Sequence, residues 1–180
     1  MKKILTILLC AVLISAFAVG CGVNDPLNNS DPQTNSSDPE NTEAQIKDTD
    51  YPDTIEGIYQ YMLALDLISE TDPVEMAADL IGAEKGNKYS YKLNGKNVVV
   101  ELYSYNTDKL SDTAKEIIDS VKTTGKFQIL GLDEVEAVMS DSGRYLLIYS
   151  DTAFNSKNPN EHNVSVRNSF IDAFKAFRNE

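Results

Sequence analysis

Two glutamates stand two positions apart in a stretch that alternates between polar and apolar residues. Glu134 and Glu136 would lie on the same side of a strand over residues 134–139, because successive side chains of a strand point to opposite faces. A pair of carboxyl groups is the catalytic unit of most glycosidases, which place the two groups on opposite sides of the glycosidic bond. Neighbours on one strand face do not meet that requirement. We interpret the pair as an exposed acidic face and keep glycan hydrolysis by carboxylates as the alternative function.

Other catalytic patterns are missing from the sequence. The one histidine, His162, lies in a polar stretch at 158–163, and the nearby Ser156 and Ser165 show neither a nucleophile elbow nor triad spacing. No glycine-rich phosphate loop is present, and a single histidine leaves mainly carboxylates as metal ligands. The sequence therefore predicts no catalytic residue, no cofactor and no metal site, and we do not expect an enzyme.

Three tyrosines are the candidate binding residues. Tyr103, Tyr105 and Tyr149 fall in or next to predicted strands, where they could gather on an exposed part of a sheet. Tyrosine offers a large amphipathic contact area at low entropic cost, and binding surfaces are enriched in it. The alternative is that the three rings belong to the edge of the core and keep their hydroxyl groups in water.

The N-terminal residues present a further chemical group, the thiol of Cys21. Two lysines and then an apolar run over residues 4–19 precede the small Gly20, which stands directly before Cys21. A short cationic start, an apolar segment and small residues are typical of a secretory signal, and the run is short for a membrane span. Cys10 lies inside the run behind bulky leucines. We therefore expect residues 1–20 to be a signal peptide that is cut before Cys21.

The stretch Ala18-Val19-Gly20-Cys21 resembles the lipobox of bacterial lipoproteins, with alanine at a position where that family more often has leucine. The resemblance covers the first 21 residues. It implies that acyl chains such as palmitate are attached to Cys21, which becomes the first residue of the mature protein. Two acyl chains give the lasting membrane attachment that one chain does not. An uncleaved signal anchor and an ordinary signal peptide are the alternatives.

The net charge of the chain limits the classes of partner that it can bind, and its composition indicates a tether. Without residues 1–20, the chain has 14 basic and 28 acidic residues and a formal charge of −14. Such a surface repels phosphate backbones, so we expect no nucleic acid partner. Contact with the membrane would come from the acyl chains on Cys21. Residues 21–50 are rich in Asn, Asp, Ser, Thr and Pro, and we expect a disordered tether there. The lysine pair at the start, this tether and the lack of disulfides resemble lipoproteins of Gram-positive bacteria.

Residues 51–180 are predicted to form one α+β domain. Apolar periodicity and capping residues predict helices over 52–68, 72–82, 111–124 and 165–178. Alternating runs predict a hairpin around Asn94-Gly95 and strands over 127–130, 134–139 and 144–150. We expect one antiparallel sheet of four to five strands with helices packed mainly on one face. This element order is faintly similar to that of β-lactamase-inhibitor-like domains.

The turn at Asn94-Gly95 fixes the pairing of the hairpin. A two-residue turn places Tyr91 opposite Val98 and Tyr89 opposite Val100, so these side chains share one face with Leu93 and Leu102. We expect that face to be buried. The opposite face would meet water or a partner, and it contains Ser90, Lys92, Asn97, Val99, Glu101, Tyr103 and Tyr105.

Taken together, the sequence predicts a lipid-anchored protein on the outside of the cell membrane. Its domain is expected to be a non-enzymatic binding module for an envelope protein or a cell-wall component. A small cell-envelope glycan hydrolase that uses carboxylates is the alternative.

Overall fold

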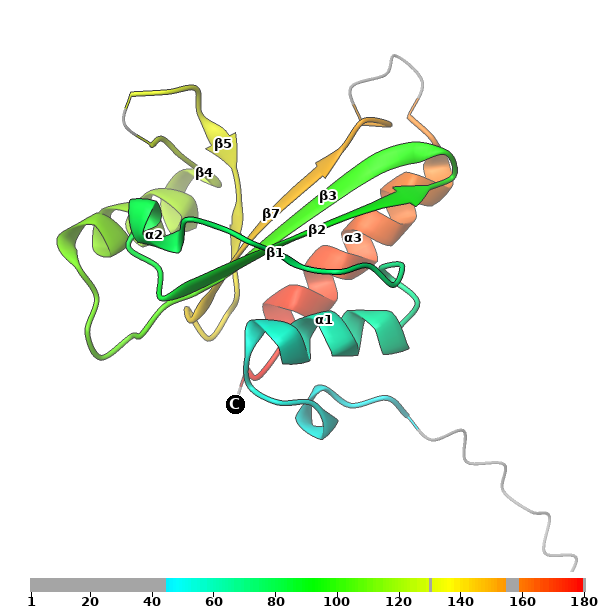
Figure 1. Cartoon of the computed structure of the whole chain (residues 1–180), viewed down its shortest axis with the longest axis horizontal. Coiled ribbons are helices and arrows are strands. Elements are labelled where there is room, and N and C mark those ends of the chain that lie inside the picture. Colours follow the sequence, from blue (N-terminus) through cyan, green and yellow to red (C-terminus); the bar gives the residue numbers. More distant parts are fainter. Residues whose placement is uncertain (1–44, 130, 155–158, 180) are drawn as a thin grey trace, which may run out of the picture. The chain divides into compact units, whose positions relative to one another are not determined.

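A computed structural model describes residues 45–129, 131–154 and 159–179 of the chain (Figure 1). The predicted signal peptide, Cys21 and most of the predicted tether lie outside the described residues. The helical elements are η1 (Asp48–Asp50), α1 (Ile55–Ala64), η2 (Ala78–Ile81), α2 (Asp112–Thr124) and α3 (Glu161–Ala176). The strands are β1 (Val74–Glu75), β2 (Lys85–Leu93), β3 (Lys96–Ser104), β4 (Lys126–Phe127), β5 (Val135–Glu136), β6 (Val138–Met139) and β7 (Tyr145–Asp151).

Five strands form an antiparallel sheet in the order β1-β2-β3-β7-β6, and β4 and β5 form a separate two-stranded sheet. The predicted hairpin register is confirmed, because Tyr91 pairs with Val98 and Tyr89 pairs with Val100. The turn works because Asn94 and Gly95 both adopt positive φ, at 51° and 75°. The chain is therefore a single α+β domain, as the sequence predicts.

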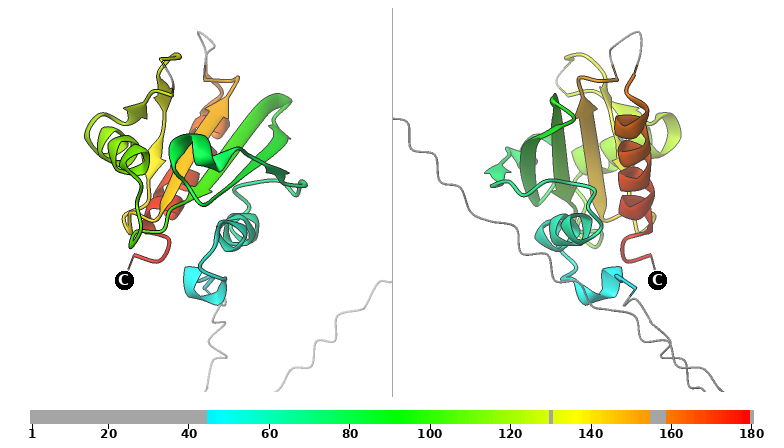
Figure 2. Two further views of the ribbon diagram at one scale, coloured as in Figure 1. Left: turned by 60° about the vertical axis from the view of Figure 1, so that its left-hand side comes forward. Right: turned by 90° about the vertical axis from the view of Figure 1, so that its right-hand side faces the viewer.

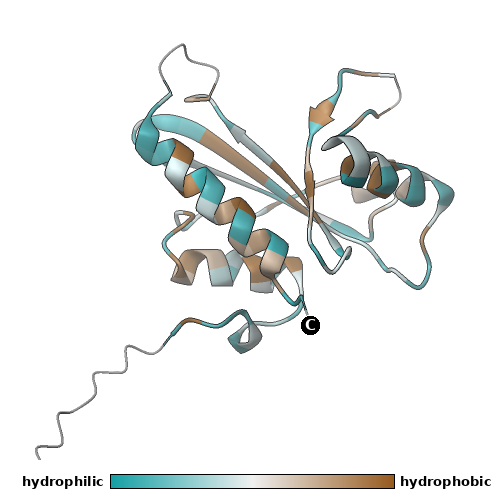
Figure 3. Ribbon diagram, turned by 180° about the vertical axis from the view of Figure 1, so that it is seen from behind, coloured by the Kyte–Doolittle hydropathy of each residue, from teal (hydrophilic) through white to brown (hydrophobic). Residues whose placement is uncertain are grey.

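Helices α1 and α3 cover one face of the sheet. Ile58 and Met62 of α1 and Phe170 and Phe174 of α3 are fully buried against the predicted core face of β2 and β3. Figure 2 shows α3 running alongside the strands, and Figure 3 shows apolar and polar segments alternating along this helix. The alternation follows from the helical period, which presents one apolar stripe to the sheet.

Helix α2 and η2 lie on the other side of the strands (Figure 1). Ala114, Ile117 and Val121 of α2 pack with Ile81 of η2 in a second core cluster. Tyr103 and Leu146, from the sheet face opposite α3, belong to the same cluster. The expectation that this face meets water or a partner is therefore wrong for the half of the sheet that lies under α2.

The predicted helix over 72–82 is wrong. Val74 and Glu75 instead form the edge strand β1, which pairs with Lys88 and Asn87 of β2. Met76 continues this edge by donating a backbone hydrogen bond to the Gly86 carbonyl over 2.9 Å. Open hydrogen-bonding groups on β2 thus outweigh the local helical pattern, and only the short turn η2 remains helical. The predicted strand over 134–139 is also divided, into β5 and β6.

The start of the described chain is fastened to its end. The Arg178 backbone N–H donates to Asp48 Oδ2 over 2.7 Å, and the Arg178 guanidinium donates to the Tyr51 and Thr49 carbonyls. Residues 48–50, which the sequence assigns to the tether, therefore belong to the folded part. As a result, the chain enters the domain at the end where α3 finishes.

Candidate functional site

Tyr103 and Tyr105 do not lie on an exposed surface. Only 6% of Tyr103 and 3% of Tyr105 is accessible, since both rings pack in the cluster under α2 and η2. The Tyr103 hydroxyl donates to Glu101 Oε2 over 2.8 Å, and the Tyr105 hydroxyl donates to the Ile81 carbonyl over 3.4 Å. Burial raises the pKa of both tyrosines, and the Glu101 carboxylate adds to the rise for Tyr103. We correct the prediction accordingly: these two rings are core residues.

Tyr149 lies on the opposite face of the sheet from Tyr103. In the register of β3 and β7, Tyr149 pairs with Val100, a residue of the face that α3 covers, whereas Tyr103 pairs with Leu146 on the other face. Paired residues share a face, and side chains along one strand alternate between faces. Val100 and Tyr103 are an odd number of positions apart on β3, so Tyr149, the partner of Val100, lies on the opposite face from Tyr103. The three predicted site residues therefore do not form one surface.

Tyr149 is half-buried beside α3. Its ring meets Phe170 edge to face, with the ring centroids 5.5 Å apart, and its hydroxyl oxygen is 3.5 Å from that of Tyr91. Burial raises the pKa of Tyr149, and this effect outweighs the lowering by the Tyr91 hydroxyl and by Arg167. The phenol is therefore neutral near pH 7 and can offer a hydrogen bond and an apolar ring face to a ligand.

Strand β7 extends beyond its partner on one side. It pairs with β3 along its whole length but with β6 only at Leu146 and Leu147. The chain before β6 leaves the hydrogen-bonding ladder of β7, because the Ala137 N–H donates to the Gly125 carbonyl over 2.9 Å and β5 pairs with β4. β5 still lies close to β7 and forms the opposite side of the space beside the strand edge. Within the described residues, no strand pairs with residues 148–151 on this side.

Two open cavities border this unpaired edge. A cavity of about 250 Å³ has an apolar floor that includes Leu147 and Ile171, and a cavity of about 530 Å³ includes Val99, Ile148 and Phe154. The two cavities have three lining residues in common, which are Glu136, Tyr149 and Arg167. We call the two cavities and the strand edge between them the β7-edge groove.

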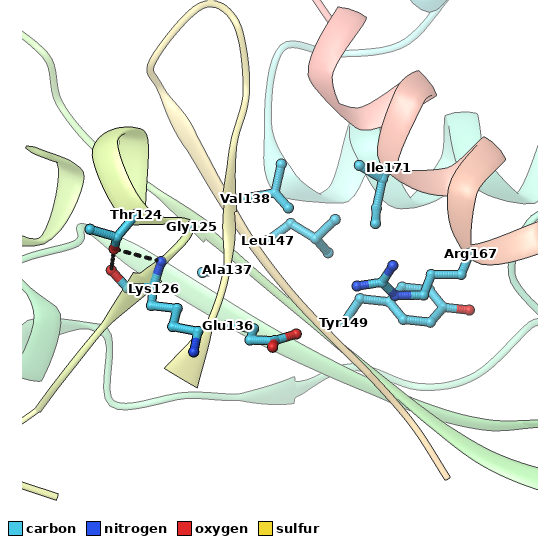
Figure 4. Close-up of a pocket in the computed structure, with 10 residues that line it drawn as sticks. All are labelled: Thr124, Gly125, Lys126, Glu136, Ala137, Val138, Leu147, Tyr149, Arg167 and Ile171. Atoms are coloured by element: carbon cyan, nitrogen blue, oxygen red, sulfur yellow. Dashed lines mark hydrogen bonds between the residues drawn. The ribbon is translucent and has the colours of Figure 1, made fainter. Parts of the chain in front are cut away.

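The charged side chains of the β7-edge groove come from both walls. Figure 4 shows Lys126 and Glu136 on one side of the smaller cavity and Arg167 beside Tyr149 on the other. The Lys126 ammonium is 3.4 Å from Glu134 Oε2 and thus has an acidic partner. The Arg167 guanidinium lies 4.6 Å from the centroid of the Phe154 ring, and no described carboxylate forms an ion pair with it. Arg167 is therefore available to a negatively charged group in the groove.

The predicted carboxylate pair also lies in this region. Glu134 and Glu136 both line the larger cavity, but both are exposed and Glu134 is paired with Lys126. His162 is exposed in the first turn of α3. No group of three metal-ligating side chains occurs in the ranges that the structure describes.

A buried polar cluster that the sequence did not reveal lies at the end of β7, where Asp151 borders the larger cavity. Asn163 is completely buried and donates from Nδ2 to Asp151 Oδ2 over 3.0 Å, while Asn94 donates to Asn163 Oδ1 over 2.9 Å. The cluster joins the hairpin turn, the end of β7 and the first turn of α3. It therefore fixes the position of α3, including Arg167, relative to the strand edge.

Comparisons with protein-family models, with curated proteins and with solved structures give no match to this chain. The similarity to the lipobox and the likeness in element order therefore rest on the sequence alone. Among the described helices, none is both long and apolar enough to cross a membrane.

Proposed function

We propose that this protein is a lipid-anchored extracytoplasmic binding protein without catalytic activity, and that the β7-edge groove is its binding site. The observation that carries the proposal is the unpaired edge of β7 between two cavities that share Tyr149 and Arg167. Exposed strand edges are interaction sites unless a protein protects them. Here the edge is lined by a tyrosine and an arginine, two residue types that binding surfaces favour.

The proposed anchor is compatible with the position of the groove. The anchor is Cys21, on the basis of the lipobox-like residues 18–21. Arg178 fastens residues 48–51 beside the C-terminal end of α3, whereas Asp151 meets the first turn of that helix. The 16 residues of α3 separate these two ends by about 24 Å at 1.5 Å per residue. Residues 48–51 and the outer end of the groove thus lie at opposite ends of α3.

A site-specific photo-cross-linker tests this site. We would place the photoreactive phenylalanine analogue benzoylphenylalanine at Phe154, which is 39% exposed beside Arg167, and irradiate cells that express the full chain. The matched control has the same group at Leu80, which is 51% exposed on η2. We expect a discrete adduct from position 154 that disappears in the Arg167→Glu variant. An adduct of equal yield from both positions, or none from position 154, would overturn the groove as the binding site.

A further inference from the structure

We infer that the β7-edge groove binds an extended peptide, which adds to β7 as a further strand and places a carboxylate against Arg167. This inference rests on the proposed function, because it names the class of partner for the same site. Strand addition to an open sheet edge is a general mode of peptide recognition, in which main-chain hydrogen bonds supply affinity and side-chain pockets supply specificity.

The hydrogen-bond pattern of β7 shows which backbone groups are available. The Arg144 carbonyl accepts from Tyr105 and the Asn97 carbonyl accepts from Thr152, so even-numbered residues of β7 face β3. The Tyr145 carbonyl instead accepts from Ser140, on the side of β6. Backbone groups of an antiparallel strand alternate in direction, so the N–H and C=O of Tyr149 point to the open side. The N–H of Asp151 points the same way.

The cavities match the side chains of an added strand. A peptide beside β7 would lie about 4.8 Å from it, and its successive side chains would point to alternate faces. One set would enter the smaller cavity over Leu147 and Ile171, and the other would enter the larger cavity over Ile148 and Val99. Both floors include aliphatic side chains, so we expect apolar residues at alternating positions of the peptide.

The positive charge of Arg167 favours an acidic group at one position of this peptide. Arg167 lines both cavities and has no acidic partner among the described residues, whereas Lys126 on the opposite wall is paired with Glu134. A carboxylate on the peptide would complete the ion pair of Arg167 by charge-assisted hydrogen bonds. A second copy of this chain is a poorer occupant, because two chains with a formal charge of −12 each repel one another.

The first experiment selects peptides from a phage-displayed library of random peptides of about 12 residues on the full chain in detergent. We expect enriched peptides with alternating apolar residues and at least one Asp or Glu. The Arg167→Glu variant should weaken their binding by about tenfold or more, the effect of removing a charged pair. Lys175→Glu makes the same charge change on an exposed residue of α3 and should leave affinity within about a factor of two.

The second experiment tests whether the bound peptide is a strand. N-methylation of an enriched peptide at every second residue removes either the amides that face β7 or those that face away. We expect one set to abolish binding and the other to preserve it, and we expect hydrogen exchange of the Tyr149 amide to slow in the complex. Equal effects of the two sets, or unchanged exchange at Tyr149, would overturn strand addition.

The remaining outcomes separate this inference from the proposed function. If no peptide is enriched but position 154 still gives its Arg167-dependent adduct, the inference is wrong and the groove remains a binding site for another ligand. If sedimentation shows a dimer of the full chain that Arg167→Glu dissociates, the occupant is a second copy and the peptide is overturned. If position 154 gives no adduct and no peptide binds, both proposals fail.

Discussion

Asn163 and Asp151 form a buried hydrogen bond of 3.0 Å between the first turn of α3 and the last residue of β7. Asn163 has no accessible surface, and only 6% of Asp151 is exposed. The second oxygen of Asp151 accepts from the Ala153 N–H over 2.7 Å, so both carboxylate oxygens have donors. The end of β7 and the start of α3, which follow one another in the chain, are thus joined through buried polar side chains.

This relationship predicts the stability of two asparagine variants on the same helix. Asn163→Ala leaves Asp151 without one of its donors in a buried position, and we expect the free energy of unfolding to fall by about 2–3 kcal/mol. Asn168→Ala changes the same residue type at an exposed position of α3 and should stay within about 0.5 kcal/mol of the wild type. Urea denaturation measures both. Similar midpoints for the two variants would contradict a structural role for the buried bond.

A substitution at Gly86 can test whether the Tyr103 ring is buried in the core. A Cβ at position 86 would lie 2.6 Å from two ring carbons of Tyr103. We expect Gly86→Ala to destabilise the domain by about 1–3 kcal/mol, the usual cost of overpacking. If Tyr103 instead faced solvent, the same change would stabilise the strand by about 0.5–1 kcal/mol, since alanine loses less backbone entropy than glycine. The sign of the shift in the urea midpoint therefore decides between the two orientations.

The Tyr103→Ala background supplies the control. Without the ring, the clash is removed, and adding Gly86→Ala should cost less than it does in the wild type. An unchanged cost would show that the strain at position 86 has another source.

Alkaline pH should destabilise the domain through its buried tyrosines. Burial raises the pKa of Tyr105 above its ordinary value of about 10 in the folded state. The folded protein therefore retains this proton more strongly than the unfolded chain, so the contribution is intact below pH 10 and is lost as the pH rises above it. We expect the free energy of unfolding to fall above pH 10 and to fall less in Tyr105→Phe. Urea denaturation of both proteins, at neutral pH and at a pH about one unit above the ordinary tyrosine pKa, measures the two losses of stability. An equal loss in both proteins would contradict this account.

Elements that are defined by local chemistry could be predicted from the sequence. The Asn94-Gly95 turn determines the hairpin register because its backbone geometry fits only that pairing. Helix α2 was predicted to within one residue at its start, because Ser111 caps it and Gly125 ends it in the left-handed conformation. Helix α3 begins four residues before the predicted start. The cap is Asn160, whose side chain accepts from the His162 and Asn163 N–H groups, and an asparagine before the helical pattern was the signal available.

Features that depend on contacts between distant residues could not be predicted. The segment at 74–75 became a strand because β2 offers an unpaired edge, and no local pattern shows that edge. The candidate site failed for the same reason: which face Tyr149 occupies depends on the pairing of β7 with β3, about 50 residues away in the chain. Arg167 was not singled out, because its position over Phe154 arises only when α3 packs beside the end of β7.

The two cysteines provide a matched test of the proposed anchor. If the residues before Cys21 function as a lipobox, Cys21→Ser removes the thiol that receives the acyl chains, and the protein should no longer incorporate labelled palmitate. Cys10→Ser makes the same change within the apolar run and should keep the label, because that position is not the acylation site. Metabolic labelling followed by capture of the full chain measures both variants. Label that persists in Cys21→Ser, or that is lost in Cys10→Ser, would contradict the proposed anchor without affecting the β7-edge groove, whose geometry depends only on the described domain.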